Sequence, residues 1–166
     1  SVLTSWRCTR HVMVNVSCLF HNLYFQNNRL YVVLLHSDNF QVARYFLTMA
    51  SLMPSIDIPH QLHFNTVEEA AVHMRNFTVS TRLALGVAPP WHDNFGHGLF
   101  DGYYPAFTGL VEFGLHHEAF DVWFRPGLCK PKSCETEEIM HQFSGGRFLP
   151  QERFASEYPG DRKSVV

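Results

Sequence analysis

Residues 94–113 read NFGHGLFDGYYPAFTGLVEF, and this stretch decides how the rest of the chain is organised. Asn94, His97 and Asp101 recur at spacings of three and four, which puts their side chains on one face of a helix. The other positions are mostly large and apolar, so the pattern predicts a helix over 94–114 that is buried on most sides. Polar side chains carried into such a place are either hydrogen-bonded to partners or used in chemistry.

The composition is typical of a globular domain and gives no reason to expect a nucleic-acid partner. The chain has 166 residues, of which 46% are hydrophobic and 17% charged, and its net charge is -2 with histidine neutral. This length predicts one domain or half of a larger one. The charge offers no electrostatic attraction for nucleic acid. The 11 histidines show no HxH or HExxH spacing and no DxD occurs, so we predict no metal site.

Both ends of the chain favour a fragment of a longer protein. The first residue is Ser1 rather than Met, and no apolar run reaches the roughly 20 residues of a membrane span. The last six residues, 161–166, read DRKSVV and resemble a sequencing-adapter read-through. We therefore expect a non-native tail there, to be kept out of fold reasoning. The alternative is a short polar tail.

Cysteines and glycosylation sequons together favour the secretory pathway. The residues concerned are Cys8, Cys18, Cys129, Cys134, Asn15 and Asn76. Disulfides within the two local pairs, Cys8 with Cys18 and Cys129 with Cys134, are the simplest of three connectivities because each loop closes over a short span. Free buried thiols are the alternative. An even cysteine count with two N-x-S/T sequons predicts a protein of the secretory lumen.

Hydrophobic periodicity predicts alternating strands and helices along the chain. Asp38 is placed to cap a helix, Thr66 and Glu69 form a capping box, Pro105 would kink or divide the central helix, and Gly114 would end it. The segment 26–28 is a turn that joins the first two strands in a hairpin. We expect strands at 12–25, 30–35, 61–65, 76–88 and 120–124, and helices at 39–52, after Thr66, at 94–114 and from Thr136 to Gly145. Strand 78–88, the central helix and strand 120–124 would form a right-handed βαβ unit.

The central stretch resembles glycosyltransferase family 61, which includes plant xylosyl- and arabinosyltransferases of xylan and animal O-linked N-acetylglucosaminyltransferases. The family signature has the form N-x-x-H-x-x-x-D, followed by aromatic residues and a proline. In this chain it reads Asn94-Phe-Gly-His97-Gly-Leu-Phe-Asp101-Gly-Tyr-Tyr-Pro105-Ala-Phe107. Upstream, Cys18-Leu-Phe-His-Asn22-Leu-Tyr24 followed by LYVVL is similar to the hairpin that opens the family domain.

This resemblance implies an α/β fold, the Rossmann-like N-terminal half of a GT-B glycosyltransferase preceded by a β-hairpin. Residues 1–146 would be the acceptor-side half, 147–160 a loop or interdomain segment, and 161–166 the non-native tail. A UDP-sugar donor would bind a second half that lies outside this chain, so the isolated fragment is expected to be inactive. The protein would reside in the Golgi or endoplasmic reticulum, with any membrane anchor N-terminal to this chain.

The signature residues suggest how sugar transfer would work. Inverting transfer from a nucleotide sugar needs a base that deprotonates the acceptor hydroxyl, and His97 with Asp101 could supply it. Asn94 would hold the loop or bind a sugar hydroxyl, while Trp91 and Tyr104 would stack on a glycan or glycoprotein acceptor. The structural alternative is that Asn94 caps the helix, that His97 and Asp101 form an i,i+4 pair, and that the aromatic rings pack in the core.

Two other function classes remain open from the sequence. The first is a non-catalytic secreted domain that binds carbohydrate or protein through an aromatic cleft. The second is an unrelated α/β enzyme such as a hydrolase, which is the weakest because no GxSxG motif occurs.

Overall fold

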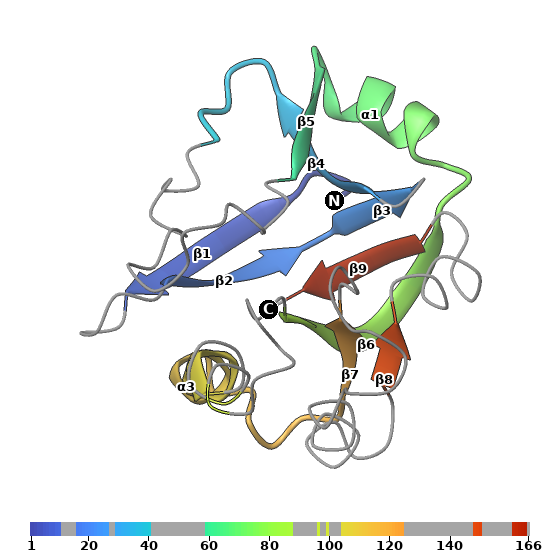
Figure 1. The fold of residues 1–166 in the computed structure, drawn as a ribbon. Coiled ribbons are helices and arrows are strands. Elements are labelled where there is room, and N and C mark those ends of the chain that lie inside the picture. The colour runs from blue at the N-terminus through green and yellow to red at the C-terminus, as the bar shows by residue number, and fades with distance from the viewer. Residues whose placement is uncertain are drawn as a thin grey trace.

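The structure is a computed structural model that describes residues 1–10, 16–26, 29–40, 59–87, 96, 99, 104–124, 148–150 and 161–165. Among these residues, strands dominate and two short helices accompany them (Figure 1). A two-stranded sheet pairs β1 with β2, and a seven-stranded sheet has the order β5-β4-β3-β9-β6-β7-β8. The bounds are β1 Ser5–Arg10, β2 Val16–His21, β3 Leu23–Gln26, β4 Arg29–Leu35, β5 His60–Phe64, α1 Val67–His73, β6 Thr78–Val87, α3 Tyr104–Glu112, β7 Phe120–Phe124, β8 Phe148–Pro150 and β9 Asp161–Val165.

Strand directions make the large sheet mostly parallel. β3 runs antiparallel to both of its neighbours, β4 and β9. The pairs β4–β5, β6–β9, β6–β7 and β7–β8 are all parallel. The carboxyl ends of the six strands other than β3 therefore meet at one edge of the sheet. The chain builds outward from β4 to β5 and then, on the other side, from β6 to β7 and β8.

The predicted strand 12–25 is two strands rather than one. Asn22 separates β2 from β3 and adopts a left-handed backbone with φ of 58°. Asparagine tolerates this conformation better than most residues, so it is a natural place for the chain to change direction. Beyond it, Tyr24 pairs with Tyr31 and Gln26 with Arg29, which confirms the predicted β3–β4 hairpin.

Hydrogen bonds around Thr4 fasten the N-terminal residues to the large sheet. The backbone N–H of Thr4 donates to Val33 O at 2.8 Å, and Val33 N–H donates to Thr4 Oγ1 at 2.9 Å. Thr4 Oγ1 also donates to Asn22 O at 2.7 Å. Asn22 Nδ2 in turn donates to the carbonyls of Ser1 and Leu3, both at 3.0 Å. Thr4 thus continues the pairing of β4 beyond the point where Asn22 bends the chain away.

Both faces of β4 are buried, as the apolar run LYVVLL predicts. On one face, Val32 and Leu34 belong to a core cluster that also contains Cys18 and Phe20 of β2. On the other face, Val33 packs in a second cluster with residues of β3, β5, α1 and the C-cap of α1, namely Tyr24, Phe64, Ala70 and Met74. The β1–β2 ribbon therefore covers one side of the sheet at β4, and α1 covers the other.

The predicted capping at the start of α1 is present with one variation. Thr66 Oγ1 accepts from Glu69 N–H at 3.1 Å, as an N-cap residue should. The Glu69 carboxylate reaches one residue further back than in the usual capping box and accepts from Asn65 N–H at 2.9 Å. Ala70 and Met74 bury the inner face of this helix.

The structure confirms that the two strands of the predicted βαβ unit pair with each other. β6 and β7 are adjacent and parallel, with α3 between them in the chain. α3 begins one residue before Pro105, which suits a first-turn proline. Gly114 ends the helix at φ of 71°: its N–H donates to Val111 O, and Leu115 N–H donates to Leu110 O. This pair of bonds is the Schellman motif expected for a C′ glycine.

Other predictions fall outside the described residues or need correction. Most of the helix at 39–52 and all of the helix after Thr136 lie outside them. Asp38 Oδ2 accepts from Leu35 N–H at 2.7 Å, so its described bond closes the turn after β4 and not a helix start. The loop expected over 147–160 is wrong for the three residues of β8, which pair with β7.

The fold class remains a prediction. Strands dominate the described residues, the two helices are short, and β3 and β9 separate β4 from β6, so a Rossmann-like half is not shown. Residues 161–165, expected to be a non-native tail, form β9 at the centre of the sheet. Strand formation does not reveal the origin of these residues, and the domain division also stays a prediction. None of the helices described here is long and apolar enough to cross a membrane.

Candidate functional site

Of the predicted catalytic segment, the structure describes the two ends and the isolated residues Gly96 and Leu99. Trp91, Asn94, His97 and Asp101 lie outside the described residues, so their geometry is not part of the structure. The segment leaves the sheet at the last residue of β6, Val87, and rejoins described structure where α3 begins. The point where the segment leaves the sheet is therefore known, although the four predicted site residues within it are not described.

That attachment is at the carboxyl edge of the parallel strands. Ligands of open α/β sheets bind in crevices outside this edge, close to where the strand order reverses. In the present sheet, the order reverses between β4 with β5 and β6 with β7. The segment after β6 thus starts at the carboxyl edge of the sheet, where the predicted α/β fold would place a ligand site.

The outer face of α3 is apolar. Tyr104, Phe107 and Val111, at helical spacings of three and four, are 62%, 44% and 43% exposed. Tyr104 is the only predicted substrate-binding residue in the described part of the chain, and its exposure makes it accessible to a ligand. The alternative, that the ring of Tyr104 packs in the core, is wrong.

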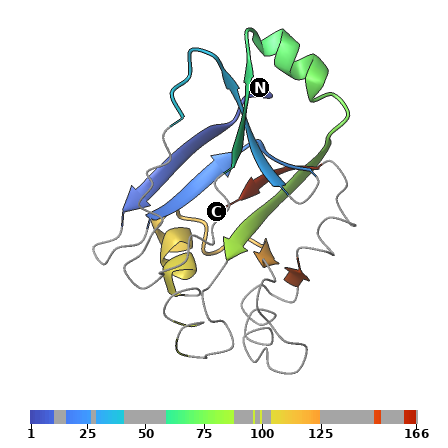
Figure 2. The same ribbon diagram turned by 45° about the horizontal axis from the view of Figure 1, so that its top comes forward.

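The inner face of α3 is held against the β1–β2 ribbon by close packing. A Cβ atom built on Gly109 would lie 2.6 Å from Ser17 Oγ and 2.8 Å from Ser17 Cβ, so only glycine lets the helix approach this strand. Phe113 lies under the guanidinium of Arg7, 5.1 Å from the ring centroid, in a cation–π contact. Figures 1 and 2 both show α3 beside the ribbon and far from α1. This packing fixes the direction in which the apolar stripe faces.

An ion pair between a buried carboxylate and an exposed guanidinium joins β6 and β7, and sequence reasoning missed it. Arg82 donates from Nε and Nη2 to Asp121 Oδ1, both at 2.9 Å. The Asp121 side chain is 1% exposed and that of Arg82 is 42% exposed. The alternating pattern of strand 120–124 shows an acidic residue within an apolar run, FDVWF, which is the only sequence signal for a buried carboxylate. Its role within the described residues is to join two parallel strands.

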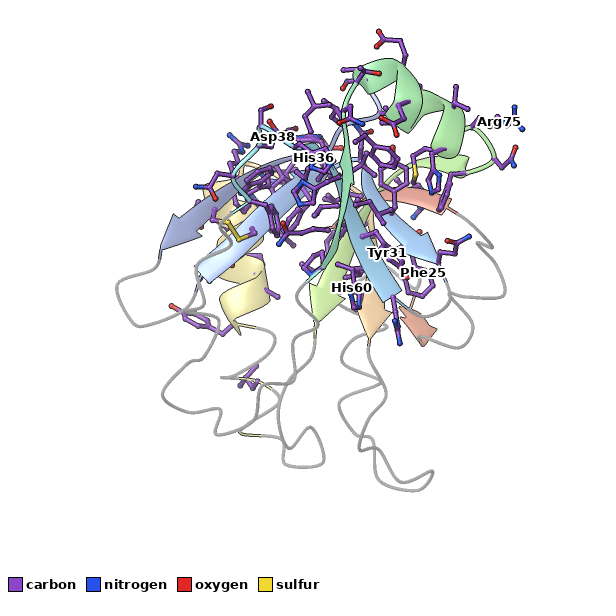
Figure 3. All side chains as sticks on the ribbon, turned by 90° about the horizontal axis from the view of Figure 1, so that it is seen from above. Phe25, Tyr31, His36, Asp38, His60 and Arg75 are labelled. Carbon is purple, nitrogen blue, oxygen red and sulfur yellow. A yellow bond between two sulfur atoms is a disulfide. The ribbon has the colours of Figure 1, made fainter. Side chains whose placement is uncertain are left out.

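Histidines gather at the carboxyl ends of β4 and β5. The rings of His36 and His63 stack with centroids 5.5 Å apart, and His63 Nε2 lies 3.1 Å from Gln61 Oε1. Figure 3 shows His36 and Asp38 beyond one end of β4, with Tyr31 and His60 towards the other end. Within the described ranges, no three His, Cys, Asp or Glu side chains lie close enough to hold a metal ion.

One of the two predicted disulfides is present. Cys8 and Cys18 face each other in the β1–β2 register and are bonded, with Cα atoms 4.1 Å apart. Cys129 and Cys134 lie outside the described residues, so their pairing stays a prediction. The same holds for the sequon at Asn15. The second sequon begins at Asn76, an exposed residue in the turn between α1 and β6.

No protein-family model matches this chain, and a search of curated proteins finds no match either. The likeness to glycosyltransferase family 61 therefore rests on the sequence motif, and family membership stays a prediction.

Proposed function

We propose that this chain belongs to a lumenal inverting glycosyltransferase that transfers a sugar of the xylose, arabinose or N-acetylglucosamine class to a glycan or glycoprotein. The observation that carries the proposal is the N-x-x-H-x-x-x-D motif between β6 and α3. Its support from the fold is the attachment of that segment to the carboxyl edge of a mostly parallel sheet. The Cys8–Cys18 disulfide is consistent with an oxidising lumen.

In this proposal, the motif supplies the base for acceptor activation. His97 or Asp101 accepts the proton of the acceptor hydroxyl while that oxygen attacks the anomeric carbon of the donor. Asn94 binds a sugar hydroxyl or holds the loop, and Trp91 and Tyr104 stack on the acceptor. The nucleotide sugar is held by a second half outside this chain, where positive groups stabilise the departing diphosphate.

The test uses a protein that contains both halves and measures sugar transfer with UDP-sugar donors. We expect His97→Ala and Asp101→Ala to lose transfer by about 100-fold or more, the usual size of general acid–base contributions. His116→Ala and Glu118→Gln are matched controls, because both residues are exposed in the turn after α3. Circular dichroism and intact Cys8–Cys18 pairing would show that the variants are folded. Near-normal transfer in both motif variants would contradict the proposal.

A non-catalytic binding domain is the second candidate, and the apolar stripe on α3 favours it. Exposed aromatic rings such as those of Tyr104 and Phe107 suit contact with the apolar face of a sugar or with a protein. If this function is correct, the isolated chain binds immobilised glycans, Phe107→Ala weakens that binding, and His97→Ala does not. If His97→Ala weakens the binding and Phe107→Ala does not, the transferase is favoured.

A further inference from the structure

Asn76 stands in an exposed turn between the buried Met74 and the partly buried Phe77. The turn follows α1, where Met74 N–H donates to Ala70 O at 2.9 Å, and Phe77 N–H then donates to Met74 O at 3.2 Å. Met74 is fully buried. The Phe77 ring packs edge-on against Tyr24, which is also fully buried, with centroids 5.3 Å apart. The backbone on both sides of Asn76 is therefore fixed while Asn76 itself faces solvent.

The Asn76 side chain is accessible to a modifying enzyme. No described residue forms a hydrogen bond with its amide group. Its neighbour Arg75 projects away from the far end of α1 in Figure 3. Asn76 is followed by Phe77 and Thr78, so it is the first residue of an N-x-T sequon. A sequon on an exposed turn can carry a bulky group without disturbing the packed residues beside it.

We propose that Asn76 carries an N-linked glycan in the mature protein and that this glycan covers the C-terminal end of α1. In the attachment step, Asn76 Nδ2 forms a bond with the anomeric carbon of an oligosaccharide carried on a polyisoprenoid diphosphate. The bond between that carbon and the diphosphate oxygen breaks, and the amide proton leaves with the diphosphate. The Cys8–Cys18 disulfide supports passage through the oxidising compartment where this reaction occurs.

The covered end of α1 is otherwise partly apolar. Val72 in the last turn of the helix is 65% exposed. A hydrated glycan attached four residues later keeps this end of the molecule in solvent. It does not cover the α3 stripe, because α1 and α3 lie far apart (Figure 2). This inference does not depend on glycosyltransferase activity.

The test directs the full chain into the secretory pathway of eukaryotic cells and maps its glycans by mass spectrometry. We expect peptide-N-glycosidase to release a glycan from the native protein and to convert Asn76 to aspartate. Asn76→Gln and Thr78→Ala should lose this glycan completely, whereas Thr78→Ser and Asn15→Gln should keep it. The pool inside the cells is analysed in the same way, so poor secretion of a variant does not prevent a result. Unmodified Asn76 in both pools would overturn the proposal.

Limited trypsin digestion tests whether the glycan covers the helix end. The bond after Arg75 directly precedes Asn76, and Arg75 is exposed. We expect cleavage there to be slower in the glycosylated protein than in Asn76→Gln, while cleavage after the exposed Arg29 stays the same. Equal cleavage rates after Arg75 would show that the glycan does not cover this end.

Discussion

At the residue scale, Asn22 and Thr4 show how two polar side chains organise the centre of the fold. Asn22 bends the chain between β2 and β3, and its Nδ2 atom holds the carbonyls of Ser1 and Leu3. Thr4 is buried, yet its hydroxyl both donates and accepts, so neither it nor the neighbouring backbone of Val33 lacks a partner. Buried polar groups are tolerated in this place because they satisfy one another.

Thr4→Val tests the contribution of this network. Valine matches the shape of threonine but leaves Val33 N–H without its acceptor in a buried position. We expect the free energy of unfolding to fall by about 1–3 kcal/mol, measured by urea denaturation. Ser1→Ala is the control, because Ser1 Oγ accepts only an exposed bond from Leu3 N–H at 3.2 Å, and it should change stability little. Equal stability of Thr4→Val and the parent would show that water replaces the hydroxyl.

At the scale of elements, α3 is positioned by two glycines that act for different physical reasons. Gly109 lets the helix approach Ser17 on β2, where no side chain fits. Gly114 has open space around it, but its φ of 71° is unfavourable for residues with a Cβ atom. The first glycine therefore sets where the helix lies and the second sets where it ends.

Gly109→Ala should destabilise the protein by forcing the helix away from β2. Overpacking of this kind costs about 1–3 kcal/mol, and the higher helix propensity of alanine returns up to about 1 kcal/mol. Thermal and urea denaturation would measure the net loss. Ser17→Gly removes both atoms that clash, so the double variant should be less unstable than the sum of the two single changes.

Gly114→Ala provides the comparison, since its cost of about 1 kcal/mol should not depend on residue 17. If Ser17→Gly rescues Gly114→Ala as well as Gly109→Ala, the close approach at Gly109 is not the cause.

At the scale of the whole molecule, β4 lies at the centre of the fold. Its side chains alternate between a cluster shared with the β1–β2 ribbon and a cluster shared with α1. Its backbone is paired with β5 on one side and with β3, then Thr4, on the other. β4 can separate from its neighbours only when both sides of the molecule open.

Hydrogen exchange should therefore be slowest at the amides of β4. We expect the amides of Val32, Val33 and Leu34 to exchange only when the whole protein unfolds. Added denaturant should therefore raise their exchange rates as it raises the unfolded fraction. The exposed turn around His116 should exchange many-fold faster. Amide-resolved exchange by NMR or mass spectrometry measures both. Exchange of β4 at the rate of the turn would contradict this view of the core.

Local sequence patterns by themselves determined the elements whose causes are short-range. The β3–β4 hairpin, the Thr66 cap, the end of α3 at Gly114 and the Cys8–Cys18 pair all depend on residues close together in the chain, and all four agree with the structure. The motif of His97 and Asp101 is equally evident in the sequence. Its role, however, depends on which residues surround it in the folded protein, and the sequence alone does not identify those residues.

Only the tertiary structure decided the arrangement of these pieces. It places β9 between β3 and β6, pairs Arg82 with Asp121 across 39 positions, and joins Thr4 to Val33 across 29. The physical reason is that a polar group removed from water needs a hydrogen-bond or ion-pair partner. Which groups become buried next to each other is known only once the sheet is assembled. The helix that begins at Tyr104 illustrates both cases. The sequence predicts its end at Gly114, whereas its exposed apolar stripe follows from the packing of the helix on β2.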